Sequence, residues 1–175
     1  WKDDPRVEGL LFRYFHFYGS YDYVGDSTRW YRREVRIVRR DPAIVSFRDA
    51  QGFRKSGRPL WVKPVDAVVH HYGWVKPPEQ QQAKQRSFHA LWHSDEWVRD
   101  RVGTNSTFDY SGIDSLAPFK GSHPAVIRER IQRQNWTFDF DPSRRRLSIK
   151  SKFKLWVEHL TGWLPGEYRN YRLLR

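Results

Sequence analysis

The sequence predicts an α+β fold, or the second half of an α/β fold, in which strands come first and helices follow. Two patterns indicate this order: residues 8–72 hold short apolar or alternating runs, and residues 79–164 hold apolar side chains at helical spacing. A length of 175 residues suits a domain that buries a sizeable core. An aromatic content of 17% excludes long disorder.

The first three segments are expected to be strand, loop and strand. Residues 8–18 are apolar and aromatic, which is typical of a buried strand. Residues 19–28 are rich in glycine, serine and aspartate, so we expect a loop there. Residues 30–39 alternate, and the face that carries Val35 and Ile37 is the more apolar one. This pattern predicts a half-buried strand.

The next segments are shorter. Residues 43–47 form a short strand candidate, and the polar residues 49–57, which include two glycines, are expected to form a loop. Residues 60–72 predict a further strand, interrupted at Pro64, where proline favours an edge or a bend.

Helical patterns follow Pro77 and Pro78, since proline is tolerated in a first helical turn. Residues 79–93 predict a helix with a modest apolar face of Ala83, Phe88 and Leu91. Residues 95–102 extend that helix or form a second one, and residues 103–121 are expected to be mostly loop. Residues 124–136 are helical in spacing. The later part of residues 144–164 predicts an amphipathic basic helix that ends near Gly162.

Charge and composition narrow the possible functions. The net charge is +12, and residues 143–175 carry nine basic residues against Glu158 and Glu167. Such an end favours polyanions, namely nucleic acid, anionic lipid or nucleotide phosphates, although a solvated basic face is the alternative. The absence of cysteine excludes disulfides and thiol chemistry, and no apolar run is long enough for a transmembrane helix. The sequence lacks Met and begins at Trp1, so we expect a processed chain or a fragment.

The segment from His70 to Pro78 has the clearest chemical pattern. Two imidazoles end a predicted strand, Gly73 allows close backbone approach, and Lys76 precedes a helix that begins with proline. Imidazole can bind Mn²⁺, and an ammonium group or a helix N-terminus can bind phosphate. Neighbouring strand residues point to opposite faces, so at most one of His70 and His71 is expected to be a ligand. The alternative is that all three side chains are ordinary strand-end or solvated residues.

These residues resemble a known enzyme family. His70-x-x-Gly73-x-x-Lys76-Pro77 resembles the His-x-x-Gly-x-x-Lys-Pro element of retaining GT-A glycosyltransferases, in which His70 would be the metal ligand. The order of segments over residues 8–98 is more similar to family-2 glycosyltransferases of the bacterial lipopolysaccharide-core type. That order is an arginine-rich strand, an acidic residue, a strand ending in His-Tyr, and a helix with lysine. It assigns the metal to His71, and both alternatives stay open.

The resemblance implies a function. Residues 1–102 would be the acceptor-side half of a GT-A-like catalytic domain, and residues 103–175 a helical, basic extension. The enzyme would transfer a sugar from a nucleotide-diphosphate donor to a hydroxyl acceptor, such as a cell-envelope glycan or glycolipid, with Mn²⁺ or Mg²⁺. Asp49 would be the general base if the enzyme inverts the configuration at the anomeric carbon. The alternative is that Asp49 is a turn residue. The nucleotide-binding half would precede Trp1, so this fragment alone would be inactive.

The remaining site residues are expected from the same glycosyltransferase hypothesis. Lys76, Gly73 and Arg36 would contact the donor diphosphate, although Arg36 could instead face solvent. The aromatic residues Tyr21, Tyr23 and Trp30 would line an acceptor cleft, or else pack in the core or at its rim.

The aspartates of Asp139-x-Asp141 have the spacing of a metal motif, but they are interpreted as turn residues before Pro142. The protein would be cytoplasmic, and its basic amphipathic helix could attach it to the anionic inner face of the cell membrane or pack on its own domain. A nucleic-acid-binding module is the second function hypothesis, from the high pI and the interleaved arginine and aromatic residues.

Overall fold

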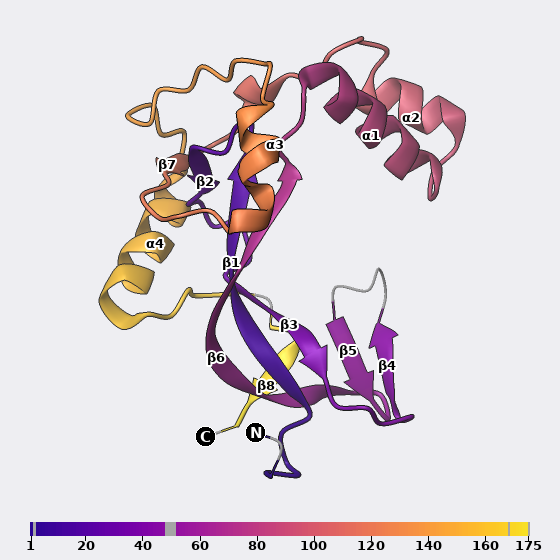
Figure 1. Cartoon of the computed structure of the whole chain (residues 1–175), viewed down its shortest axis with the longest axis vertical. Coiled ribbons are helices and arrows are strands. Elements are labelled where there is room, and N and C mark those ends of the chain that lie inside the picture. Colours follow the sequence, from indigo (N-terminus) through magenta and orange to yellow (C-terminus); the bar gives the residue numbers. More distant parts are fainter. Residues whose placement is uncertain (2, 48–51, 168, 175) are drawn as a thin grey trace. The chain divides into compact units, whose positions relative to one another are not determined.

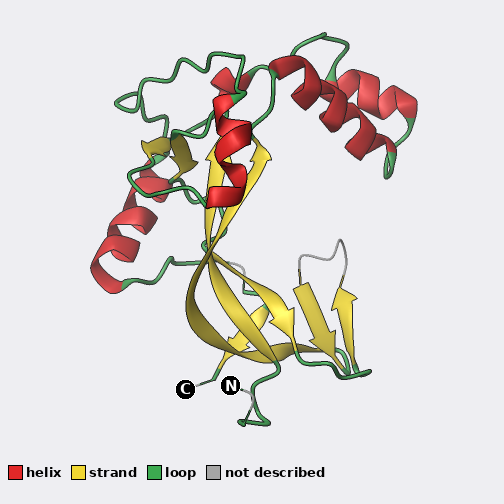
Figure 2. Cartoon of the chain, in the orientation of Figure 1, coloured by secondary structure: helices red, strands yellow, loops and turns green. Residues whose placement is uncertain are grey.

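The computed structural model describes residues 1, 3–47, 52–167 and 169–174, and it has a mixed α/β architecture (Figure 1). Asp49 lies outside the described residues. Strands dominate the first part of the chain and helices follow, as the sequence predicts (Figure 2). The strands are β1 Gly9–Tyr18, β2 Tyr23–Gly25, β3 Arg33–Val38, β4 Ile44–Phe47, β5 Gly52–Lys55, β6 Arg58–Trp74, β7 Leu116–Pro118 and β8 Tyr171–Leu173. The α-helices are α1 Pro78–Ala90, α2 Asp95–Val102, α3 Arg128–Gln132 and α4 Ile149–Thr161.

The chain forms two compact units. The first unit comprises Trp1–Phe15, Thr28–His70 and Ile149–Arg175, and the second comprises His16–Ser27 and His71–Ser148. The long strands β1 and β6 contribute to both units. The division at residue 102 that the sequence suggests concerns catalytic roles, and it stays a prediction.

The first unit is built on a mixed sheet in which β4, β5, β6 and β1 lie in that order. Strand β3 also pairs with β1, and β8 pairs with β6 in parallel. Its core consists of the apolar side chains Leu11, Val35, Leu60, Val62 and Tyr171. These residues come from strands far apart in sequence, so the sheet pairing assembles the core.

A β-bulge changes the burial expected for residues 30–39. Leu10 pairs with Ile37 and Leu11 pairs with Val35, which leaves Arg36 as the extra residue of β3. Val35 is buried, whereas Ile37 is 43% exposed. The strand is half-buried as predicted, but Val35 and Ile37 do not share a buried face, because the bulge resets the alternation.

Part of the expected loop over residues 49–57 is a strand. Strand β5 pairs with β4, and Lys55 pairs with Arg58 across the turn formed by Ser56 and Gly57. Both turn residues have positive φ, 47° and 80°, as a two-residue hairpin requires. Strand β6 is also unbroken through Pro64, which lies beyond Val62, the last residue that pairs with β8. The proline thus falls outside that ladder.

The second unit contains a strand that the sequence does not reveal. Residues 19–28 were expected to be a loop, but β2 pairs with β1 at Phe17 and along its length with β7. Phe17 stacks on Tyr72 at 4.7 Å between ring centroids and meets Phe119 edge-on at 4.8 Å. Aromatic packing therefore supplies much of this core.

Helix α1 begins one residue before the predicted helix over residues 79–93 and ends three residues earlier, and it does not bury the predicted face. Phe88 and Leu91 are exposed, Leu91 by 72%, and Ala83 is exposed too. The buried side chains are instead Gln81 and Gln82. The expected apolar face is therefore wrong, because this helix buries its polar side within the unit.

The later helices follow the sequence prediction more closely. Helix α2 is separate from α1, and Ser94 caps it by accepting a hydrogen bond from the backbone N–H of Trp97 at 3.3 Å. Asp141 forms the expected turn by accepting from the N–H of Ser143 at 2.9 Å. Helix α4 ends at Thr161, directly before Gly162. No helix within the described ranges is long and apolar enough to cross a membrane.

Candidate functional site

The junction between β6 and α1 brings chemically useful side chains together in the second unit. After Trp74 the backbone turns, with the N–H of Val75 donating to the carbonyl of Tyr72 at 3.1 Å. Pro77 then precedes α1 and Pro78 is its first residue. We call His71, Gly73, Lys76 and Lys84 the strand-end site.

The two histidines contact different partners. The His70 ring meets Phe15 edge-on at 5.7 Å, and the His71 ring meets His16 edge-on at 5.3 Å. Successive residues of β6 thus face successive residues of β1, as strand alternation requires. His70 belongs to the first unit and His71 to the second, so His71 is the histidine of the strand-end site.

Gly73 makes room for His71. A Cβ built at Gly73 would lie 2.6 Å from Cε1 and 2.8 Å from Nε2 of the His71 ring. No real side chain fits at those distances, so the glycine lets the imidazole lie against the backbone. The sequence suggested close approach of a ligand here, and in the structure the imidazole occupies this space.

Two lysines lie at this junction. The Nζ of Lys84, from α1, donates to the carbonyl of Gly73 at 2.6 Å and lies 5.7 Å from the Trp74 ring centroid. Burial, and next the charge of Lys76, lower the pKa of Lys84. The carbonyl of Lys76 accepts from the hydroxyl of Tyr110 at 2.9 Å, which holds the backbone of this segment. Two positively charged side chains at one junction favour an anionic ligand.

Lys84 is the site residue that sequence reasoning missed. It follows Gln81 by three residues, so both lie on one face of α1. Gln81 is fully buried, and its side-chain nitrogen and oxygen have no hydrogen-bond partner in the part of the chain that the structure describes. In the sequence, the available signal was a glutamine followed by a lysine one turn later. That signal points to a site only when the buried face of α1 is known.

The strand-end site does not by itself supply enough ligands for the predicted metal ion. No group of three or more histidine, cysteine, aspartate or glutamate side chains suited to a metal occurs among the described residues. His71 and His16 supply an imidazole pair, which is fewer ligands than a protein metal site normally has. A Mn²⁺ or Mg²⁺ ion bound here would need further ligands, and it stays a prediction.

The predicted acceptor tyrosines also lie in the second unit. Tyr21 is 2% exposed and packs against Tyr72 and His123, at 5.5 Å and 6.0 Å between ring centroids. Tyr23 is half-buried, and its hydroxyl donates to the carbonyl of Phe140 at 3.3 Å. Tyr21 is thus part of the core here, whereas Tyr23 lies near its rim, and the acceptor role of both stays a prediction.

Trp30 and Arg36 belong to the first unit. Trp30 lines a pocket of about 310 Å³ with Tyr31 and Lys154 among its other walls. Arg36 donates to the hydroxyl of Tyr14 and to the carboxylate of Glu34. Its charge is therefore already balanced by Glu34, which weakens the case for Arg36 as a diphosphate ligand.

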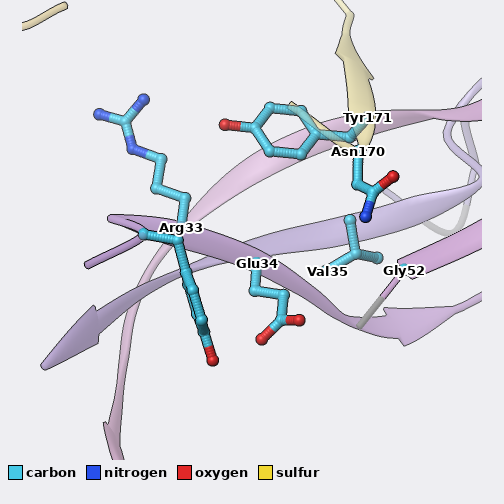
Figure 3. A pocket seen from close by; sticks show the side chains of 7 residues that line it. Arg33, Glu34, Val35, Gly52, Asn170 and Tyr171 are labelled. Carbon is cyan, nitrogen blue, oxygen red and sulfur yellow. The ribbon is translucent and has the colours of Figure 1, made fainter. Parts of the chain in front are cut away.

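A second pocket in the first unit contains a buried carboxylate (Figure 3). It measures about 60 Å³, and Figure 3 shows Asn170 and Tyr171 facing Glu34 and Val35 of β3 across it. Burial raises the pKa of Glu34 in spite of Arg36. A carboxyl group of this kind binds its proton at a higher pH than an ordinary one does.

No protein-family model matches this chain, and no curated protein or solved structure is significantly similar to it.

Proposed function

We propose that this chain is the acceptor-side half of a GT-A-like glycosyltransferase, and that the strand-end site binds the diphosphate of a nucleotide-sugar donor. The observation that supports this most is that the Nζ of Lys84 lies 2.6 Å from the Gly73 carbonyl, in the short segment that carries Lys76 and leads into α1. A diphosphate would relieve the repulsion between the two ammonium groups and would also meet the positive end of the helix.

The same charges would favour the reaction. In glycosyl transfer the acceptor oxygen bonds to the anomeric carbon, the bond from that carbon to the diphosphate oxygen breaks, and the acceptor proton passes to a base. Negative charge grows on the departing diphosphate. Ammonium groups already in place stabilise that charge without reorganisation. Lys76 would act as a mobile point charge, while Lys84 is held by the Gly73 carbonyl.

The proposal is tested by calorimetry on the natural protein that contains this chain, with UDP-, GDP- and dTDP-sugars and Mn²⁺. We expect binding of at least one donor, weakened about tenfold or more in Lys76→Ala and in Lys84→Ala, since a hydrogen bond to a charged group contributes about 1.5–3 kcal/mol. Lys120→Ala is the matched control, because Lys120 is an exposed lysine of the same unit.

Two outcomes would contradict the proposal. One is the absence of binding to the natural protein with every donor tested. The other is equal binding by all three alanine variants. If instead the protein binds nucleic acid in a filter assay, with affinity falling steeply between 50 and 200 mM salt, the nucleic-acid hypothesis is favoured.

A further inference from the structure

Helix α4, in the first unit, exposes a continuous apolar stripe. Ile149, Phe153, Trp156 and Leu160 are 87%, 61%, 58% and 61% exposed, and Trp163 just after the helix is 49% exposed. Their spacing of three and four residues places the four helical side chains on one face. A stripe of this size is normally covered by a partner surface.

Basic side chains border this stripe. At 100° per residue, Lys150 and Lys152 project on opposite flanks of the face that carries Ile149 and Phe153. Both lysines are exposed. An apolar stripe flanked by lysines and containing tryptophan matches the interface between lipid headgroups and acyl chains, where long cationic side chains reach the headgroups.

The single acidic residue of α4 lies on the opposite face and is neutralised. Glu158 accepts two hydrogen bonds from the guanidinium of Arg32, at 2.8 Å and 2.9 Å. Its exposed fraction is 22%, so this side of the helix is the one packed within the first unit. The hydroxyls of Ser151 and Thr28 add a contact of 3.3 Å on that side. The outward face of α4 thus combines apolar surface with net positive charge.

We propose that α4 docks in the plane of an anionic lipid bilayer, with Phe153 and Trp156 inserted and with Lys150 and Lys152 against lipid phosphates. The charge of the face selects this occupant over a second copy of the chain, because two such faces would bring their lysines together. Thirteen residues span about 20 Å, which is shorter than the ~30 Å hydrocarbon core, so the helix lies on the membrane. This inference does not depend on the proposed function.

The test uses the full chain in a co-sedimentation assay with vesicles of phosphatidylcholine alone or with 30% phosphatidylglycerol. We expect at least tenfold stronger binding to the anionic vesicles, and weaker binding as salt rises. The double variant Lys150→Gln/Lys152→Gln should lose about 25-fold, because each lysine near the surface contributes about 1 kcal/mol, or fivefold. Lys63→Gln/Lys120→Gln, at two exposed lysines elsewhere, should bind like the wild type.

The apolar side chains have their own matched variants. Phe153→Ser/Trp156→Ser should lose at least tenfold in binding to the anionic vesicles. Phe88→Ser/Trp92→Ser, at an exposed aromatic pair of the second unit, should bind normally. All four positions are exposed, so the variants should keep the circular dichroism of the wild type.

Equal binding to both kinds of vesicle, or equal losses in the two serine variants, would overturn the proposal. It would also fail if light scattering showed self-association that Phe153→Ser/Trp156→Ser abolishes, in a chain that does not bind vesicles. That result would assign the apolar stripe to a second copy.

Discussion

Arg32 and Glu158, which are 126 positions apart in sequence, form a two-pronged ion pair. The Nε of Arg32 donates to Oε1 of Glu158 at 2.8 Å, and Nη2 donates to Oε2 at 2.9 Å. Both side chains are about three-quarters shielded from solvent. Parallel charge-assisted bonds of this kind fix orientation as well as adding energy, so the pair sets which face α4 turns outward.

Breaking this pair should destabilise the protein. For Arg32→Ala we expect a loss of about 1–2 kcal/mol in the free energy of unfolding by urea, because a partly buried carboxylate is left without its partner. The control is Arg133→Ala, since the pair Arg133–Glu129 is about 75% exposed and should contribute less than about 0.5 kcal/mol. Similar losses in the two variants would contradict the anchoring role of Arg32.

Acid should weaken the first unit through Glu8. Its carboxylate accepts two bonds of 2.7 Å from Arg58 and one of 2.9 Å from the N–H of Trp61. Hydrogen bonding to Arg58 is the largest of the causes that lower the pKa of Glu8 from 4.5 to about 2. A depressed pKa gives stability that is full above the unfolded-state pKa and is lost as pH falls through the folded-state value.

We therefore expect Glu8 to contribute up to about 3 kcal/mol at neutral pH, lost between about pH 4.5 and pH 2. Urea unfolding across this range measures the slope. Glu8→Gln should flatten it, whereas Glu129→Gln, at an exposed carboxylate, should not. An unchanged slope in Glu8→Gln would show that other carboxylates cause the acid sensitivity.

The stability that Glu34 contributes should change with pH in the opposite direction to that of Glu8. Burial raises its pKa, so its ionised form is less favourable in the folded state than in the unfolded state. Its contribution to stability is then lost as pH rises from the unfolded-state pKa through the folded-state value. In carboxyl NMR, Glu34 should titrate above 4.5, and the stability of Glu34→Gln relative to the wild type should increase between pH 4 and pH 7. A titration at or below 4.5 would contradict this.

The contact between Gly73 and His71 predicts a pair of coupled substitutions. Gly73→Ala should cost about 1–3 kcal/mol of stability, because the new Cβ meets the imidazole at 2.6 Å. In a His71→Ala background the same change should cost much less, and a double-mutant cycle measures the difference. Gly112→Ala is the control, since a Cβ there meets nothing within 4 Å. Additive effects at positions 71 and 73 would show that the two residues do not compete for space.

Sequence patterns predicted the elements that are long or that begin at a proline. The apolar run of β1 and the prolines at the start of α1 act within a few residues, and each of these two elements begins within one residue of where the sequence predicts it. The short strands β2 and β5 were missed, because they are three and four residues long, contain glycine, and pair only when another strand lies beside them. Strand pairing of this kind is a tertiary effect.

The candidate site also combines residues that the sequence groups together with a residue that only the fold brings to them. His71, Gly73 and Lys76 are close in sequence, so their grouping at a strand end followed from the chain order. Lys84 joins them only because α1 turns its polar face inward, against its own hydrophobic pattern. The pocket around Glu34 depends on β8, which lies more than 130 residues further along the chain. No local pattern encodes such a partnership.

The sequence by itself determined the order of strands and helices, the basic charge, and the amphipathic pattern of α4, because these depend on composition and on spacing over one or two turns. The tertiary structure decided which face of each element is buried, since burial depends on what lies opposite it. It placed Arg32 against Glu158 and so left the apolar stripe of α4 exposed. It also placed the Nζ of Lys84 within hydrogen-bond distance of the Gly73 carbonyl, across from its neighbours in the sequence.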